Sequence, residues 1–195
     1  MDKESDLVQT RILTAILTGL NRSYPFVSAK KQEEFEEQTN MFYRITHTSV
    51  FNRSTQALIL LFQIHSASGQ APDRYYRALY DRLLAPDLHN SSKLSMFLNL
   101  LFRSVNADNN ESRVFAFIKR ILQVGAQAKP SLVCGMLFLI SEIIKRHPKL
   151  WTAIQQPEER PSGTDEKDSL YQPFKRDPQY SNANESCFWE LVCIF

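Results

Sequence analysis

Glycine is scarce in this sequence, and several signatures that would define a function are missing. Only 5 of the 195 residues are glycine, and they lie far apart, which excludes a glycine-rich loop that cradles phosphates. No Gly-x-Ser-x-Gly elbow marks a hydrolase nucleophile. The histidines have no cysteine, histidine or carboxylate partner at metal-ligand spacing. We therefore expect neither an enzyme nor a protein that binds a metal or another cofactor.

Cysteines are few, and no apolar run is long. Three cysteines, an odd number without the spacing of a disulfide framework, fit a reducing compartment. The most apolar stretch, residues 132–144, contains Glu142 and is shorter than the roughly 20 apolar residues that a bilayer requires. We expect no contact with a membrane.

The charges are unevenly distributed, although the net charge is only +2. Residues 1–157 carry a net charge of +6 and residues 158–195 a net charge of −4. A basic body with an acidic tail is compatible with a nucleic-acid neighbour. It is equally compatible with an ordinary solvated surface.

Hydrophobic periodicity predicts an all-α protein. Apolar residues return near a 3.6-residue period in seven segments, with proline or small polar residues between them. We expect helices at about 3–20, 30–48, 52–66, 72–84, 91–105, 111–126 and 130–147. The last of these is apolar on nearly all sides, which is typical of a central, buried helix.

Short turns between these helices predict antiparallel helical hairpins. The pairs fall about every 40 residues, a spacing typical of HEAT-like or armadillo-like repeats, and thus of an α-solenoid. A closed helical bundle is the alternative. We expect a helical-repeat part at 1–154, a flexible linker without apolar side chains at 155–169, and an extended strap with a short C-terminal helix at 170–195.

Apolar side chains recur with the helical period along these helices, and in the helix at 91–105 those expected to face inward are Leu94, Phe97, Leu98 and Leu101. The other apolar sets come mainly from four helices. In the first they are Leu7, Ile12, Ile16, Leu17 and Leu20. In the third and sixth they are Ala57, Leu58, Leu61, Phe62, Ile64, Val114, Phe117, Ile118, Ile121 and Leu122. In the last they are Leu132, Val133, Met136, Leu137, Phe138, Ile140, Ile143 and Ile144.

One helix combines arginines with aromatic residues. Its candidate RNA-binding residues are Arg74, Tyr75, Arg77 and Arg82, because cations and aromatic rings together suit phosphate contact and base stacking. In the alternative, the apolar stripe of this helix is buried and its arginines face solvent. Arg113, Lys119 and Arg120 form a second, weaker patch with the same two interpretations.

The C-terminal segment from Tyr171 to Leu191 has no helical periodicity over most of its length. Pro173 and Pro178 bracket the triplet Lys175-Arg176-Asp177 and force extended or turn backbone. Asn182 or Asn184 is expected to cap a helix from about Glu185 that buries Phe188, Trp189, Leu191 and Val192. The segment is either a strap packed on the helices or the support of a binding surface. Its candidate partner-binding residues are Tyr171, Phe174, Arg176, Asp177, Pro178 and Trp189.

The same segment resembles the signature of the CCAAT-binding-factor (CBF) domain family. The string Tyr171-Gln-Pro-Phe-Lys-Arg-Asp-Pro178, followed by the run to Trp189-Glu-Leu191, carries most of this resemblance. Further similar stretches lie at 17–26, 51–62, 73–80, 115–120 and 134–142, so the resemblance covers nearly the whole chain.

The resemblance implies a nuclear, mostly nucleolar, helical-repeat scaffold without enzymatic activity. Such proteins pair with a paralogous nucleolar assembly protein on the precursor of the large (60S) ribosomal subunit, which brings precursor rRNA within reach. Family members are several times longer, so we expect a chain truncated at both ends: a fragment, a truncated isoform or an incomplete gene model. A regulator acting at CCAAT promoter elements and a plain HEAT-type protein adaptor are the alternatives. DNA is the less favoured ligand, because the sequence has no zinc finger, basic zipper or recognition helix.

Overall fold

The computed structural model describes residues 2–28, 34, 35, 37–67, 69–155 and 171–194, and these residues form helices and connections without a β-strand. The predicted all-α fold of solenoid-like helical hairpins is confirmed. The α-helices are α1 (Asp2–Ser23), α3 (Thr39–Thr48), α4 (Phe51–Ala67), α5 (Asp73–Arg82), α6 (Leu94–Asn106), α7 (Glu111–Gly125), α8 (Pro130–Arg146), α9 (Pro148–Gln155) and α10 (Glu190–Ile194). Short 3₁₀ helices are η1 (Tyr24–Phe26), η2 (Pro86–Asn90), η4 (Pro178–Tyr180) and η5 (Ala183–Glu185).

Most predicted helices agree with the structure to within a few residues, and one helix was missed. The last predicted helix ends near Pro148, but Pro148 is also the first residue of a further helix, α9. Proline suits the first position of a helix, where its missing N–H has no intrahelical partner. Within the second predicted helix, α3 begins at Thr39 after a turn at Gln38, and residues 34, 35 and 37 are also helical. Residues 29–33 and 36 lie outside the described residues. The predicted linker, apart from Gln155, also lies outside the described residues.

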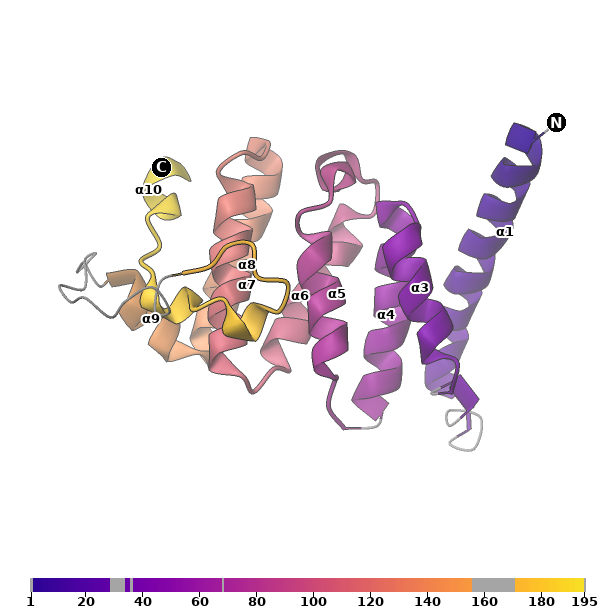
Figure 1. Ribbon diagram of the computed structural model, residues 1–195, viewed down its shortest axis with the longest axis horizontal. Coiled ribbons are helices and arrows are strands. Elements are labelled where there is room, and N and C mark those ends of the chain that lie inside the picture. The colour runs from indigo at the N-terminus through magenta and orange to yellow at the C-terminus, as the bar shows by residue number, and fades with distance from the viewer. Residues whose placement is uncertain (1, 29–33, 36, 68, 156–170, 195) are drawn as a thin grey trace. The chain divides into compact units, whose positions relative to one another are not determined.

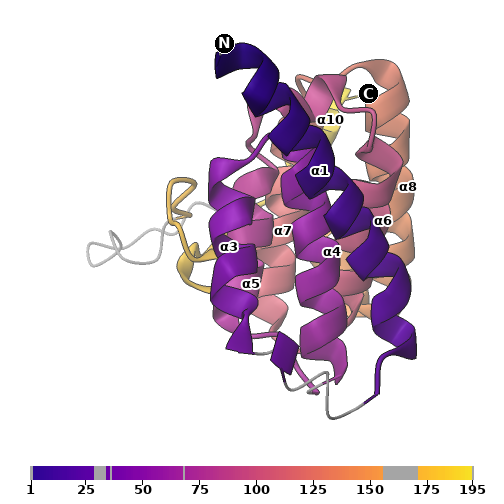
Figure 2. The same ribbon diagram turned by 90° about the vertical axis from the view of Figure 1, so that its right-hand side faces the viewer.

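The chain divides into two compact units. The first comprises residues up to 78 together with 91–93. In it, α4 packs against both α3 and α1, and Figure 2 shows α3 beside α4 with α1 running obliquely to them. The inward side chains predicted for α4 are all buried, as the helical period requires.

Helix α1 is less buried than its sequence suggested. Leu17 is only 1% exposed, but Ile12 and Ile16 are about half exposed, so the apolar period of α1 does not mark a fully buried face. Val8, Ile12 and Ile16 lie one helical turn apart and form an apolar stripe on the accessible side of α1.

The second unit comprises residues 79–90 and 94–195. Its central helix is α7, in which Val114, Phe117, Ile118, Ile121 and Leu122 are buried as predicted. Helix α7 packs against α8, and α6 also packs against α8.

Helix α8 is not buried on all sides. Leu132, Met136, Leu139, Ile140 and Ile143 face the core, whereas Phe138 is 69% exposed and Cys134 is exposed. The prediction of a fully buried α8 is therefore wrong. On its outer side, α8 and α6 enclose an apolar groove of about 510 Å³, lined in part by Leu98, Phe102 and Phe138.

Candidate interaction surface

The C-terminal segment, residues 171–194, lies along α7. Its elements η4, η5 and α10 all contact that helix, and Figure 1 shows the segment passing across α7. Proline starts η4 at Pro178, where a fixed φ and a missing N–H are tolerated. Asn182 adopts a left-handed conformation with φ of 54°, which asparagine accepts better than most residues. These residues give the segment a defined path without a long helix.

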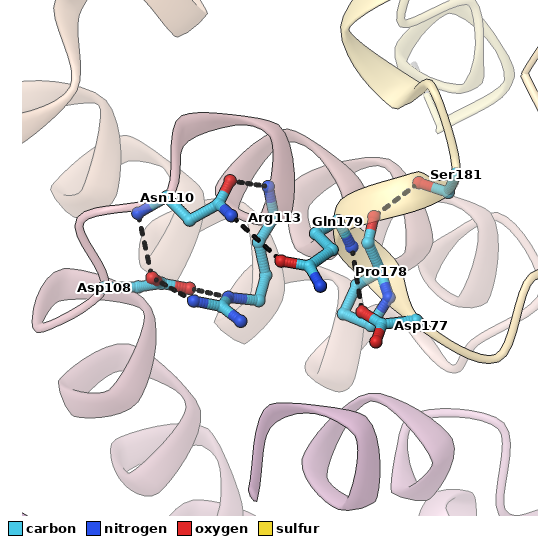
Figure 3. A network of polar contacts seen from close by, with 7 residues as sticks. All are labelled: Asp108, Asn110, Arg113, Asp177, Pro178, Gln179 and Ser181. Atoms are coloured by element: carbon cyan, nitrogen blue, oxygen red, sulfur yellow. Dashed lines mark hydrogen bonds and ion pairs between the residues drawn. The ribbon is translucent and has the colours of Figure 1, made fainter. Parts of the chain in front are cut away.

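An ion pair immediately before α7 fixes the start of that helix (Figure 3). The Arg113 guanidinium donates from Nε to Asp108 Oδ2 at 2.5 Å and from Nη2 to Asp108 Oδ1 at 3.0 Å. Both residues are at most 3% exposed. The backbone N–H of Asn110 donates to Asp108 Oδ1 at 2.9 Å. A bidentate pair with this extra donor is the arrangement that lets a carboxylate remain buried.

Asn110 connects this ion pair to the C-terminal segment. It is the N-cap of α7, since its side-chain oxygen accepts the N–H of Arg113 at 3.2 Å. Its amide nitrogen donates to Gln179 Oε1 at 3.2 Å. Within the segment, Asp177 caps η4 by accepting the N–H of Gln179, and the Ser181 hydroxyl donates to the carbonyl of Pro178 (Figure 3). One network thus joins the start of α7 to η4.

Arg120 holds the segment about two turns beyond Arg113 along α7. Its Nη2 donates to the carbonyl of Pro173, and its guanidinium lies 3.4 Å from the centre of the Tyr80 ring. Burial lowers the pKa of Arg120, although the nearby Tyr80 and Tyr171 oppose this shift. An arginine only 4% exposed needs such partners, because a buried cation without them is costly.

Lys119 anchors the last turn of the segment. Its Nζ donates to Glu190 Oε2 at 2.8 Å and to the carbonyl of Cys187. Both side chains of this ion pair are at most 2% exposed. The rings of Tyr171, Phe188 and Trp189 lie 5.6–5.9 Å from the ammonium, within cation–π range. Lys119 therefore holds α10 and the chain before it against α7.

The predicted partner-binding residues separate into two groups. Tyr171, Asp177 and Pro178 face their own unit: Pro178 is buried, and the Tyr171 hydroxyl donates to Gln123 Oε1 at 3.3 Å. Phe174, Arg176 and Trp189 are exposed, Phe174 by 97% and Trp189 by 54%. The predicted burial of Phe188 is confirmed, but that of Trp189 and Val192 is wrong. The reason is that α10 begins only at Glu190, five residues later than expected.

The predicted RNA-binding residues of α5 are also separated. Tyr75 is completely buried and packs against Phe62 and His65, so its ring is not accessible to a base in this structure. Arg74 is exposed, with its guanidinium 4.1 Å from the Tyr43 ring centre and Nη1 2.6 Å from Asn40 Oδ1. Arg77 is half-buried, and Arg82 pairs with Asp81 at 2.7 Å.

The second predicted patch is not a surface patch. Arg113, Lys119 and Arg120 are 3%, 1% and 4% exposed, so neither RNA contact nor a solvated helix face describes them. Sequence reasoning missed Asp108 and Glu190, which pair with Arg113 and Lys119, and it missed the hydrogen bond from Asn110 to Gln179. Asp108 and Asn110, placed just before a helix, were the available signal, since such residues favour helix N-caps. Nothing local in the sequence points to Gln179 or Glu190.

Two phenols, those of Tyr80 and Tyr171, lie close to Arg120. Burial raises the pKa of Tyr171 and of Tyr80, so both phenols stay protonated at neutral pH. Across the described ranges, no three His, Cys, Asp or Glu side chains gather as a metal site. None of the helices described is both long and apolar enough to cross a membrane.

Comparison with known proteins gives the chain a family context. The family model described as the CBF/Mak21 family matches residues 54–194. Ribosome biogenesis protein NOC1 of Chaetomium thermophilum is 40% identical over 97% of this chain and 20% of its own length. CCAAT/enhancer-binding protein zeta of Homo sapiens is 43% identical over 84% of this chain and 15% of its own length. Nucleolar complex protein 1 of Drosophila melanogaster is 30% identical over 73% of this chain and 13% of its own length. The chain thus spans a fifth or less of these relatives' length.

Proposed function

The chain belongs to the CBF/Mak21 family, and from this premise we propose that it is a non-enzymatic scaffold of ribosome biogenesis. It acts in the nucleolus, on precursors of the large (60S) ribosomal subunit. Its partners are a paralogous nucleolar assembly protein and other components of that particle, with precursor rRNA as a further ligand. The similarity to relatives named for ribosome biogenesis and for a nucleolar complex supports this assignment.

The observation that carries the proposal is the rigid attachment of the C-terminal segment. Two buried cations of α7 engage the segment directly, since Lys119 donates to Glu190 and Arg120 donates to the carbonyl of Pro173. Asn110, in the loop that the Arg113–Asp108 ion pair supports, donates to Gln179. A segment fixed in this way keeps Phe174, Arg176 and Trp189 in defined positions on the surface. Preorganised exposed aromatic and arginine residues are typical of binding surfaces, since less conformational entropy is lost when a partner binds.

The test is purification of the tagged chain from nuclear extract, followed by sequencing of the bound RNA and identification of the bound proteins. Large-subunit assembly factors together with precursor rRNA are the expected result. Promoter DNA with transcription proteins in their place would overturn the proposal in favour of a CCAAT regulator. Protein partners without any ribosomal precursor would favour the HEAT-type adaptor.

A matched variant makes this test specific to the surface. Trp189→Ser removes an exposed ring of the C-terminal segment, whereas Trp151→Ser removes a ring of similar exposure, 53%, from α9. Loss of partners with Trp189→Ser but not with Trp151→Ser is expected. If both variants retain the same partners, Trp189 is not part of the proposed surface.

A further inference from the structure

Residues 172–181 form a closed loop whose tip is displayed to solvent. The N–H of Gln172 donates to the carbonyl of Ser181 at 2.8 Å, which brings the two ends of the loop together. A tight turn follows at once, because the N–H of Lys175 donates to the carbonyl of Gln172. Compact loops with closed ends are frequently functional.

Both sides of this loop are held by α7 and the residue that caps it. On the first side, the carbonyl of Pro173 accepts from Arg120. On the second, Gln179 accepts from Asn110, and Pro178 is buried. The residues between these anchors therefore project from a fixed base.

The tip consists of Phe174, Lys175 and Arg176, and all three side chains are exposed. Phe174 is 97% exposed, so its ring contributes almost no hydrophobic burial to the stability of the fold. Within the described part of the chain, no hydrogen bond or ion pair occupies the side chain of Lys175 or Arg176. A second ring of the same loop, Tyr180, is 61% exposed.

The acidic member of the triplet does not share this exposure. Asp177 is half-buried, and its carboxylate accepts the N–H of Gln179 as the N-cap of η4. The triplet Lys175-Arg176-Asp177 has a formal net charge of +1, and its folding exposes the two cations at the tip while the carboxylate accepts a backbone N–H. The charge displayed at the tip is thus positive.

We propose that the tip of the 172–181 loop is a contact site for single-stranded RNA. A base stacks on the Phe174 ring while Lys175 and Arg176 neutralise the neighbouring phosphates, which is the combination that single-strand binding proteins use. A protein partner fits less well, because the cores of protein interfaces are depleted of lysine, and Lys175 is the exposed residue next to Phe174 in the chain. The inference rests on the proposed function only for the identity of the RNA.

The test measures binding of the purified full chain to a fluorescein-labelled oligouridylate of about 12 nucleotides, by fluorescence anisotropy over a range of salt concentrations. Phe174→Ala is expected to weaken binding by about 5- to 150-fold, the usual loss for one stacking residue. Lys175→Gln/Arg176→Gln is expected to lower the slope of log K against log salt by about 1.4, since two phosphate contacts are lost.

Matched controls come from α8 of the same unit. Phe138→Ala removes another exposed ring, and Lys145→Gln/Arg146→Gln removes another exposed pair of adjacent cations. Both control proteins are expected to bind as the unmodified chain does. All variants are expected to melt at the same temperature, because the altered side chains are exposed.

Three results would overturn the inference. They are no oligouridylate binding by the unmodified chain, unchanged binding by both tip variants, and equal losses in tip and control variants. Capture of a polyglutamate peptide without capture of RNA would overturn it in favour of an acidic protein partner. None of these results decides the proposed function, because purification of ribosomal precursors with the tagged chain is measured separately.

Discussion

Helices α5 and α7 both combine basic and aromatic residues, yet their cations have opposite environments. On α5, Arg74 lies on the surface over Tyr43, and Arg82 pairs with a neighbouring aspartate. On α7, Lys119 and Arg120 are buried, and each donates to a backbone carbonyl of the C-terminal segment. The difference lies in what covers the helix: a segment rich in carbonyl and carboxylate oxygens can cover cations, whereas apolar helices cannot. Basic–aromatic patterns therefore do not identify an RNA surface without knowledge of the covering segment.

The largest effect that separates the two helices is expected from Lys119→Met. This change leaves Glu190 buried without its cation, and we expect the free energy of unfolding to fall by about 3–5 kcal/mol in urea titrations. The double variant Lys119→Met/Glu190→Leu should recover most of that loss, because an apolar pair of similar volume replaces a buried ion pair at little cost. A loss below about 1 kcal/mol in the single variant would mean that this pair does not anchor the segment.

A smaller effect is expected from Asn110→Ala, which removes the N-cap of α7 and the hydrogen bond to Gln179. The capping loss alone lowers the free energy of unfolding by about 1 kcal/mol. Gln179→Ala removes only the hydrogen bond between Asn110 and the segment, which contributes about 0.5–1.5 kcal/mol. Its loss should therefore be smaller than that of Asn110→Ala, which removes both this bond and the N-cap. Chemical denaturation of both variants measures the difference. A Gln179→Ala loss larger than that of Asn110→Ala would contradict the assignment of Asn110 as the connecting residue.

Arg74→Ala should have a still smaller effect, because its partners are at the surface. An exposed cation–π contact contributes about 0.5–1 kcal/mol, and this sets the expected loss in a thermal or urea titration. Arg120→Ala is the comparison on α7 and should destabilise the chain more, because it leaves the carbonyl of Pro173 without its donor. Equal losses at the two positions would remove the distinction between α5 and α7.

The smallest expected effect is a pH dependence at His147, the residue between α8 and α9. Burial and the nearby Arg146 lower the pKa of His147 below its usual 6.5, although Glu111 and Asp108 oppose the shift. The unfolded chain then binds a proton at a higher pH than the folded chain, so stability should fall as pH drops through 6.5. His147→Gln should flatten this slope between about pH 7 and pH 5, as melting temperatures would show. If the melting temperature of His147→Gln depends on pH as steeply as that of the unmodified chain, the result contradicts the burial of a neutral His147 imidazole.

Most of the helical framework could be predicted because it follows from local patterns. The 3.6-residue period located the buried faces of α4 and α7, and prolines and polar turns located most helix ends. Pro148 shows the limit of this reasoning, since one residue both ends α8 and begins α9. The exposure of Phe138 and Ile16 shows another, because periodicity identifies an apolar face without saying whether a neighbour covers it.

The candidate site was predictable only as a stretch of sequence. The two prolines and the resemblance to the CBF family identified the C-terminal segment, and the family is confirmed. The contacts that fix it join residues about 50–70 positions apart, such as Lys119 and Glu190 or Arg120 and Pro173. No period or spacing encodes such pairs. For this reason the buried cations of α7 were interpreted as a surface patch.

Amide hydrogen exchange tests most directly the claim that buried cations of α7 hold the C-terminal segment. The amides of Gln172, Leu191 and Val192 are hydrogen-bonded within the segment, and those of α4 serve as an internal reference. We predict slow exchange at all of them in the unmodified chain, and faster exchange in Lys119→Met at the segment but not at α4. If the segment amides exchange equally slowly in the unmodified chain and in Lys119→Met, Lys119 does not hold the segment. If they exchange equally fast in both proteins, the segment is not held against α7 at all.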